Sequence, residues 1–297
     1  MDRVLLERKT RDYQDLSIRM DSYLFRKFGL VKNAVNLKID NYYLNCVPFD
    51  LSLGSCRAIS ILGGKEIVFF SEYIGTTQNL NLTLHHPGFS KPISLFLRVK
   101  LQEFKQHNPD SNVCIIEMQF VSVPNDFKEI FVGVADELTF CRELYNDDAR
   151  GTASVGVDTL RDHLGSPYFT LRVEGSWERT GKVIALSARS IVLFVDTEGL
   201  QIAGTQPVEV EYESPSVTAS GVVREVKSVA NTPGYAAVAI DLQYAAPYVD
   251  LVGTLLPKGS DGAAKDDGRD DARDPGAAAS TGDVRGVSPD AAGGPAK

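Results

Sequence analysis

The sequence predicts a mainly β protein with two tandem six-stranded antiparallel β-barrels, an N-terminal helical segment, an interdomain helix and a disordered C-terminal tail. Apolar and polar residues alternate in several short runs, among them NLNLTLH at 79–85 and VEVEYE at 208–213. This period of two is typical of half-buried antiparallel strands. A length of 297 residues gives room for two domains, each with its own core.

Similar segments recur at a constant distance along the chain. IVFF at 67–70 resembles IVLF at 191–194, and EMQF at 117–120 resembles DLQY at 241–244. The members of both pairs are 124 residues apart. A shared offset indicates an internal duplication, and we therefore expect two copies of one all-β module.

Six strands are expected in each copy, because turn residues separate short apolar runs at regular spacing, as in a small barrel. In the first copy the predicted strands lie near 41–50, 56–62, 66–71, 79–85, 93–105 and 112–123. In the second copy they lie near 167–174, 179–186, 190–196, 206–213, 217–228 and 235–245.

Helices and a tail are expected outside the strands. Residues 1–30 have apolar positions at helical spacing, and a second helix should follow Pro124 with Asn125 as its N-cap. The tail contains no aromatic residue, so it cannot bury enough apolar surface to fold. The predicted organisation is a helical segment at 1–39, a first barrel with its C-terminal helix at 40–145, a linker at 146–165, a second barrel at 166–257 and a disordered tail at 258–297.

Composition excludes several classes of function as defaults. The formal net charge of −8 disfavours nucleic acid as a partner of the whole chain, because phosphate binding needs clustered Lys and Arg. The four cysteines lie in apolar runs without metal-ligand spacing, so we expect buried free thiols and no metal site. No stretch has the length of a membrane span, and a cytoplasmic location is expected.

Between Tyr168 and Pro247 the second copy has an IVLFV strand, then QPVEVEY, a long strand and AAVAIDLQY. In this series of segments it resembles the PilZ domain. The layout of both copies is similar to that of bacterial proteins with a PilZ-like N-terminal barrel before the PilZ barrel. Members of that family bind cyclic di-GMP through Arg-x-x-x-Arg before the first strand and Asp/Asn-x-Ser-x-x-Gly after the second. Guanidinium groups suit the two phosphates and the flat guanines of this ligand.

The serine turn of this chain matches the family pattern only in part. Ser187 is retained, whereas Ala185 stands at the Asp/Asn position and Ser190 at the glycine position. Arg189, inside the same turn, is a further candidate ligand residue. The turn therefore either binds the nucleotide or only keeps the shape of a turn that binds it in relatives.

The arginine pair is also incomplete. Arg161 precedes the first strand of the second copy, but Gly165 stands where the second arginine is expected, and Arg172 lies within the strand as a partial substitute. Losing such charge-assisted hydrogen bonds weakens binding by a factor of about 100 or more. The resemblance thus implies a cyclic di-GMP site at Arg161, Arg172, Ser187 and Arg189, and we expect its affinity to be weak or absent.

The first copy contains a second near match, Asp50-Leu51-Ser52-Leu53-Gly54, which is one residue short of the family spacing. No arginine pair precedes it, and we interpret it as a hairpin turn.

The function that the resemblance implies is that of a non-enzymatic bacterial signalling protein regulating motility or surface behaviour. Its ligand would be cyclic di-GMP, and its output would pass to an unidentified protein partner through a hinge at the linker. The alternative is a ligand-independent PilZ-like adaptor. No catalytic residues and no cofactor other than this possible ligand are predicted, because phosphate-binding and nucleophile motifs are missing from the sequence.

Overall fold

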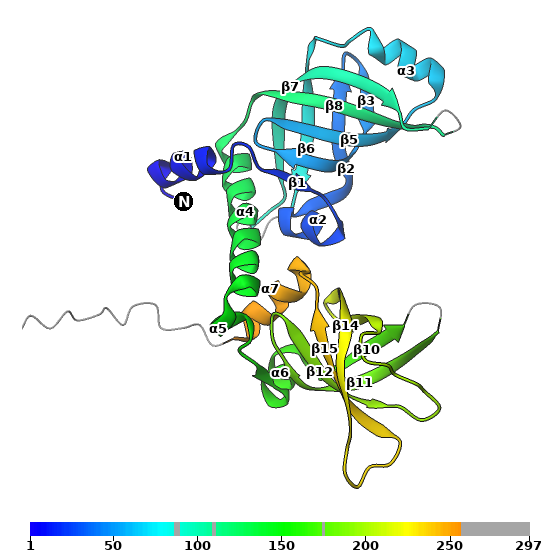
Figure 1. The fold of residues 1–297 in the computed structure, drawn as a ribbon. Helices are drawn as coiled ribbons and strands as arrows, with labels where there is room; N and C mark the ends of the chain where they lie inside the picture. The colour runs from blue at the N-terminus through cyan, green and yellow to red at the C-terminus, as the bar shows by residue number, and fades with distance from the viewer. Residues whose placement is uncertain (86–89, 109–110, 174–175, 257–297) are drawn as a thin grey trace, which may run out of the picture. The chain divides into compact units, whose positions relative to one another are not determined.

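The computed structural model describes residues 1–85, 90–108, 111–173 and 176–256, which form two antiparallel sheets and several helices (Figure 1). These elements belong to one compact unit, Met1–Pro257. The predicted tail lies outside the described residues. No helix in the described part of the chain is long and apolar enough to cross a membrane.

The second sheet is a closed six-stranded barrel, as predicted. Its strand order is β10-β13-β14-β15-β12-β11, and β10 also pairs with β11, which closes the ring. The strands are β10 (Tyr168–Val173), β11 (Trp177–Leu186), β12 (Ser190–Asp196), β13 (Pro207–Glu213), β14 (Ser216–Ser228) and β15 (Tyr235–Leu242). The helix α7 (Ala246–Leu255) follows. All six predicted strands are confirmed.

The first sheet is not the six-stranded barrel that the sequence predicted. It is an open sheet with the order β1-β4-β5-β8-β7-β6-β2-β3. The strands are β1 (Ser17–Arg19), β2 (Leu30–Ile39), β3 (Tyr42–Asn45), β4 (Val47–Ser52), β5 (Ser55–Ile61), β6 (Thr77–Leu84), β7 (Ile93–Gln106) and β8 (Val113–Ser122). Only Cys46 separates β3 from β4 in the chain, and the predicted strand at 41–50 is thus interrupted there.

Two segments of the N-terminal half of the chain were predicted wrongly. The expected strand at 66–71 belongs to the helix α3 (Gly64–Ser71), in which Phe70 is buried while Val68 is exposed. Glu66 accepts a hydrogen bond from the N–H of Gly63 and so caps this helix. Conversely, Leu30–Ile39 is a strand and not helical, because Val35, Leu37 and Ile39 alternate into the core.

The duplication is present in the topology, although the matching segments do not define it. The strand orders β4-β5-β8-β7-β6-β2 and β11-β12-β15-β14-β13-β10 correspond one to one. IVFF, however, lies in α3, whereas IVLF lies in β12, so that match is a coincidence. Nor is the distance between equivalent residues constant. Ser55 pairs with Gln119 in the first sheet, and Ser190 pairs with Asp241 in the second. Ser190 follows Ser55 by 135 residues, whereas Asp241 follows Gln119 by 122.

Helices join the two cores. After α1 (Arg3–Asp12) and α2 (Ser22–Phe28), the long helix α4 (Asn125–Asn146) follows β8, and its N-cap is Pro124 rather than Asn125. Phe131 of α4 packs in the first core, and Leu144 packs in the second. The segment predicted as a linker contains α5 (Asp148–Gly151), β9 (Val155–Gly156) and α6 (Val157–Leu164), and its Leu160 is buried. It is therefore packed against the second barrel rather than extended.

Candidate ligand site

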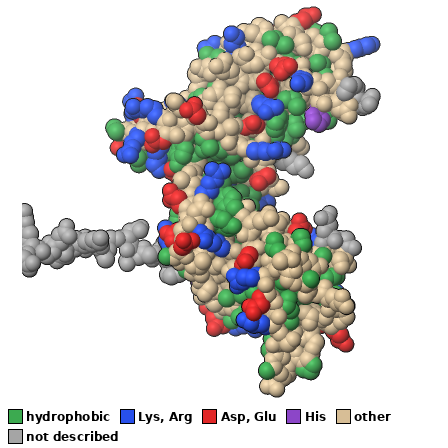
Figure 2. All heavy atoms as spheres, viewed as in Figure 1, with side chains coloured by type: hydrophobic (Ala, Val, Ile, Leu, Met, Phe, Trp, Pro, Cys, Tyr) green, Lys and Arg blue, Asp and Glu red, His purple; other side chains and the backbone are tan. Residues whose placement is uncertain are grey.

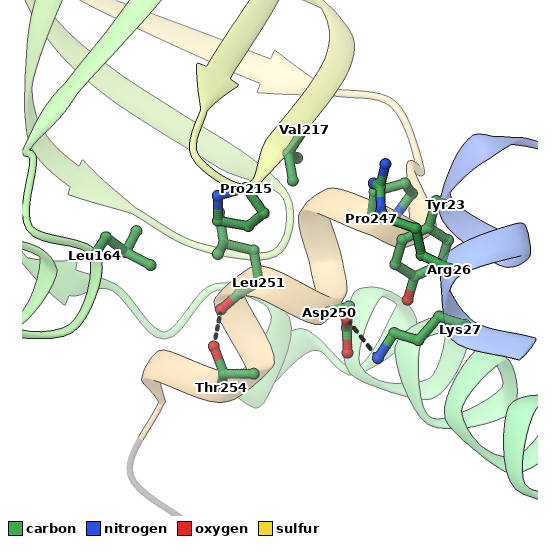
Figure 3. A pocket seen from close by; sticks show the side chains of 10 residues that line it. All are labelled: Tyr23, Arg26, Lys27, Leu164, Pro215, Val217, Pro247, Asp250, Leu251 and Thr254. Carbon is green, nitrogen blue, oxygen red and sulfur yellow. Dashed lines mark hydrogen bonds and ion pairs between the residues drawn. The ribbon is translucent and has the colours of Figure 1, made fainter. Parts of the chain in front are cut away.

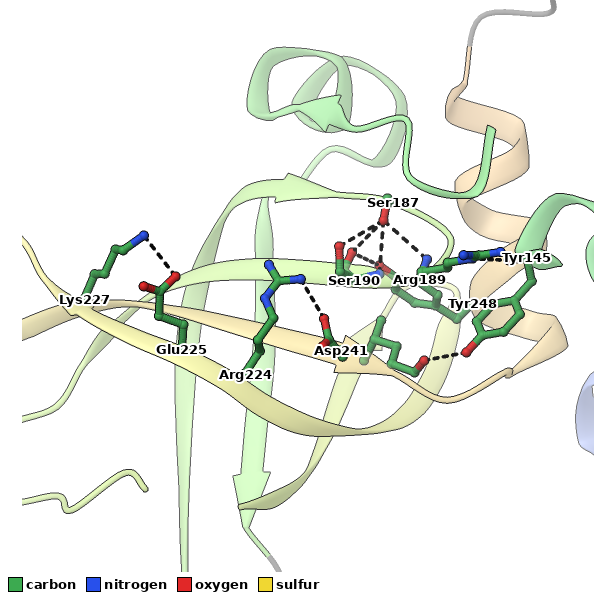
Figure 4. Close-up of polar contacts among 10 residues, drawn as sticks. Tyr145, Ser187, Arg189, Ser190, Arg224, Glu225, Lys227, Asp241 and Tyr248 are labelled. Atoms are coloured by element: carbon green, nitrogen blue, oxygen red, sulfur yellow. Dashed lines mark hydrogen bonds and ion pairs between the residues drawn. The ribbon is translucent and has the colours of Figure 1, made fainter. Parts of the chain in front are cut away.

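The serine turn between β11 and β12 is organised by one buried hydroxyl. Ser187 is only 2% exposed, and its Oγ accepts hydrogen bonds from the N–H groups of Ser190 at 3.0 Å and Arg189 at 3.3 Å. The hydroxyls of Ser187 and Ser190 lie 3.0 Å apart (Figure 4). Ser187 thus satisfies two backbone donors of its own turn, and serine and related side chains stabilise turns in this way.

Arg189 joins this turn to the end of α4. Its Nε donates a hydrogen bond to the backbone carbonyl of Tyr145, and its guanidinium lies over the Tyr145 ring, 5.7 Å from the centroid. Its Nη1 lies 2.8 Å from Asp148 Oδ1. The carboxylate of Asp148 is 95% exposed, so water screens this ion pair strongly. The guanidinium that the sequence assigned to a ligand is therefore in contact with the chain itself.

A close backbone approach holds this contact together. A Cβ at Gly151 would lie 2.6 Å from the carbonyl oxygen of Leu144 and 3.1 Å from Arg189 Nε. The hydroxyl of Tyr145 donates to the carbonyl of Leu242 at 2.8 Å, which ties α4 to β15. Only glycine allows α5 to pack this closely against the end of α4.

Asp147 caps the N-terminus of α5 and so fixes where this helix begins. Its carboxylate accepts hydrogen bonds from the N–H groups of Arg150 and Ala149, and these bonds hold the pKa of Asp147 below its ordinary value. Next along the chain, β9 pairs with β11, with Val155 opposite Leu186. The segment predicted as the linker and hinge thus contains a strand that pairs with β11, which leads into the serine turn.

The other two predicted arginines do not join Arg189. Arg172 lies opposite Glu178 in the β10–β11 ladder, and Ser187 is nine residues further along the chain. At about 3.3 Å per residue, the path between the two positions is about 30 Å. Glu178 and Glu211 also engage the guanidinium of Arg172, at 2.8 and 3.2 Å. Arg161 lies on α6 and is 3.8 Å from Asp158 of the same helix.

Several residues of the site escaped the sequence analysis. Tyr145 and Asp148 contact Arg189 across 44 and 41 residues. Arg224 of β14 lies close to the turn because it pairs at 2.8 Å with Asp241, the residue opposite Ser190 (Figure 4). Burial raises the pKa of Tyr248, whose hydroxyl donates to the Ser190 carbonyl at 3.4 Å. No local spacing signals such contacts, because they arise between distant strands and helices.

The first sheet has an equivalent serine turn between β4 and β5. Ser52 Oγ accepts from the N–H groups of Gly54 and Ser55, at 3.1 and 2.8 Å, and lies 2.9 Å from the Ser55 hydroxyl. Asp50 lies 3.7 Å from Arg57 and accepts a hydrogen bond from the Ser17 hydroxyl. The interpretation of this segment as a hairpin turn is confirmed.

Two cavities lie elsewhere in the described residues. The larger, of about 370 Å³, is lined on one side by apolar side chains including Pro215, Val217 and Leu251, and on the other by Arg26 and Lys27 of α2 (Figure 3). The smaller, of about 310 Å³, is lined by residues that include Tyr168, Thr180 and Glu211. Neither is lined by Ser187 or Arg189.

Surface charge adds no obvious anion site on the face drawn in Figure 2. Lys and Arg side chains are interspersed there with Asp and Glu rather than gathered in one field.

Comparison with known proteins places the first part of the chain. Residues 5–134 match the family model of the PilZN3 domain. This part of the chain is similar in sequence to the PilZN3 domain. It includes the whole open sheet and the N-terminal half of α4. The resemblance to tandem PilZ-type proteins, predicted from the second copy, is confirmed by this match of the residues that precede it.

Solved structures with similar chains include three proteins. PlzA of Borreliella burgdorferi in complex with c-di-GMP is 16% identical, with 86% of this chain and 99% of that chain covered and a TM-score of 0.38. MrkH of K. pneumonia in its apo state is 9% identical, with 81% and 94% covered and a TM-score of 0.28. YcgR of Escherichia coli in complex with c-di-GMP is 8% identical, with 80% and 89% covered and a TM-score of 0.26. No curated protein matches the sequence.

Proposed function

We propose that the protein is a non-enzymatic signalling protein of the PilZ type that acts through protein contacts and regulates motility or surface behaviour. The observation that carries this proposal is the contact of Arg189 with Tyr145. It connects the turn in which relatives of the resembled family bind their ligand to the helix that packs in both cores. A change at the turn therefore acts on α4, which contacts both domains.

In this proposal, cyclic di-GMP binds weakly or not at all. Arg189 is engaged by the chain itself, and Arg172 is engaged by glutamates about 30 Å away along β11. A ligand would have to replace the contacts of Arg189 with Tyr145 and Asp148 before it gained the arginine. Titration calorimetry with purified full-length protein and cyclic di-GMP tests this. Because the second arginine and the Asp/Asn of the family pattern are missing, we expect a dissociation constant above about 100 µM or no heat of binding. Sub-micromolar binding would overturn it.

The second candidate is a cyclic di-GMP effector, which the intact hydrogen bonding of Ser187 favours. Hydrogen exchange separates the two candidates. Under the effector hypothesis, millimolar cyclic di-GMP protects both 186–190 and 146–165 from exchange. Under the first proposal, in which the protein acts through protein contacts without the nucleotide, exchange in both segments is unchanged by cyclic di-GMP. Arg189→Gln is the matched variant, because it removes the guanidinium without touching Ser187.

A further inference from the structure

The outer face of four adjacent strands of the first sheet, β3, β2, β6 and β7, carries two ordered rows of side chains. The ladder registers place Tyr43 beside Lys38, Lys38 beside Asn79, and Asn79 beside Arg98. The neighbouring row runs from Asn45 through Asn36 and Asn81 to Phe96. Because residues two apart on a strand share a face, all eight side chains lie on one side of the sheet. We call this surface the Asn-aromatic face.

Two aromatic side chains stand in solvent on this face. Tyr43 is 62% exposed and Phe96 is 64% exposed, whereas Leu37, Leu80 and Leu97 on the opposite face are completely buried. The ammonium group of Lys38 lies 5.6 Å from the centroid of the Tyr43 ring. Neither side chain belongs to the buried core, so both rings are available for a base to stack on.

Three polar side chains of the face, Asn81, Lys38 and Arg98, lack a hydrogen-bond or ion-pair partner among the described residues. Asn81 Oδ1 is buried and accepts no hydrogen bond. Within the described ranges, neither Lys38 nor Arg98 forms an ion pair, unlike Arg57 on the same sheet, which pairs with Glu117 at 3.2 Å. Buried amide oxygens are normally satisfied, so an unsatisfied one on the same face as two cations that form no ion pair indicates a polar ligand.

The charge of the chain is unevenly divided. Residues 1–134 contain 16 Lys and Arg and 14 Asp and Glu, a formal charge of +2, whereas the remaining residues contain 15 and 25, a charge of −10. No carboxylate occurs in either row of the Asn-aromatic face. The argument from the whole-chain charge against nucleic acid therefore does not apply to this surface.

We propose that the Asn-aromatic face binds single-stranded nucleic acid. Bases stack on exposed aromatic rings of four-stranded sheets, two or three at a time, and cations contact the phosphates. Asparagine amides form paired hydrogen bonds with base edges, and the face offers Asn36, Asn45, Asn79 and Asn81. The strands span about 14 Å across, at about 4.8 Å per step, which suits a few nucleotides. The two rows expose no aliphatic side chain, which disfavours a protein partner here.

Fluorescence anisotropy with the full chain and a labelled 12-residue oligouridine or oligothymidine tests this proposal. We expect binding that weakens as salt is raised from 50 to 200 mM. The slope of log affinity against log salt should fall by about 0.7 in Arg98→Gln, because one phosphate contact is lost. Phe96→Ala and Tyr43→Ala should each weaken binding about fivefold to 100-fold.

Matched controls lie on the second barrel. Tyr168 is 52% exposed on β10, and Lys227 is an exposed cation on β14. Tyr168→Ala and Lys227→Gln should leave oligonucleotide binding unchanged. The proposal is overturned if 100 µM protein binds neither oligonucleotide at 50 mM salt, or if Phe96→Ala and Arg98→Gln bind as the unmodified chain does. Binding of an oligoglutamate peptide without oligonucleotide binding would also overturn it and indicate an acidic protein partner. The result is independent of the cyclic di-GMP titration, because neither Ser187 nor Arg189 lies on this sheet.

Discussion

Arg189 and Tyr145 form a double contact: the guanidinium of the turn residue lies 5.7 Å from the centroid of the helix residue's ring and donates to its backbone carbonyl. The two residues are 44 positions apart in sequence. Tyr145 in turn donates its hydroxyl to Leu242, next to the strand residue opposite the turn. The turn, the end of α4 and the end of β15 are thus connected through two side chains.

Removing this contact should destabilise the fold measurably but modestly. Arg189→Gln loses a charge-assisted hydrogen bond, and because the side chain is 31% exposed we expect a loss of about 1 kcal/mol in the free energy of unfolding. Asp148→Asn should change it by less than about 0.5 kcal/mol, because the carboxylate is solvated. Urea unfolding of both variants measures the difference. Equal losses would mean that the ion pair, and not the bond to Tyr145, stabilises the turn.

Alanine should change the stability of the protein in opposite directions at Gly151 of α5 and Gly133 of α4. Gly151→Ala places a methyl group 2.6 Å from the Leu144 carbonyl, and we expect a loss of about 1–3 kcal/mol in stability. Gly133 lies in α4, where an added methyl group would have nothing within 4 Å, so Gly133→Ala should stabilise the protein by about 0.5–1 kcal/mol. Thermal or urea unfolding gives both values. A neutral Gly151→Ala would show that α5 moves away at little cost.

The serine turns at Ser187 and Ser52 have the same hydrogen-bond pattern but differ in burial, so the two serines can be compared to measure the effect of burial on stability. Ser187→Ala leaves the N–H groups of Arg189 and Ser190 without their acceptor in a buried turn, and we expect a loss of about 1–3 kcal/mol. Ser52→Ala removes the same pattern at an exposed turn, where water replaces the hydroxyl. Its stability should change by less than about 0.5 kcal/mol. Similar losses in both variants would contradict the role of burial.

The sequence predicts the second barrel well because its strands are short, half-buried and separated by strong turn signals. In β12 and β13 the buried positions alternate as the residues do. The same reasoning failed for IVFF, because a run that is apolar throughout shows neither the period of 2 of a strand nor the period of 3.6 of a helix. The structure forms a helix there, and Glu66 caps its N-terminus. The contacts of Arg189 were beyond reach, because only the packing of α4 against the barrel brings Tyr145 to the turn.

The ion pairs of Lys27 predict a pH dependence at alkaline pH. Its ammonium group lies 2.9 Å from Glu137 and 3.0 Å from Asp250, which joins α2, α4 and α7. Burial alone lowers the pKa of Lys27, but the hydrogen bonds and charges of Glu137 and Asp250 outweigh it and raise the pKa above the ordinary 10.5. A raised pKa in the folded state means that Lys27 contributes fully below pH 10.5 and that its contribution is lost as pH rises through the raised pKa.

Lys27→Met should therefore destabilise the protein by about 1–2 kcal/mol at pH 7, because two carboxylates lose their partner. Above pH 10.5 the stability of the unmodified chain should fall towards that of the variant. Burial raises the pKa of the neighbouring Cys141 to about 12. This thiol also lowers the stability of the folded protein as pH rises, and it does so in the unmodified chain and in the variant alike. Urea unfolding between pH 7 and pH 11.5 measures the stability of the unmodified chain and of the variant as a function of pH. Lys65→Met is the control, because Lys65 is exposed. A constant difference between unmodified chain and variant across this range would contradict the titration of Lys27.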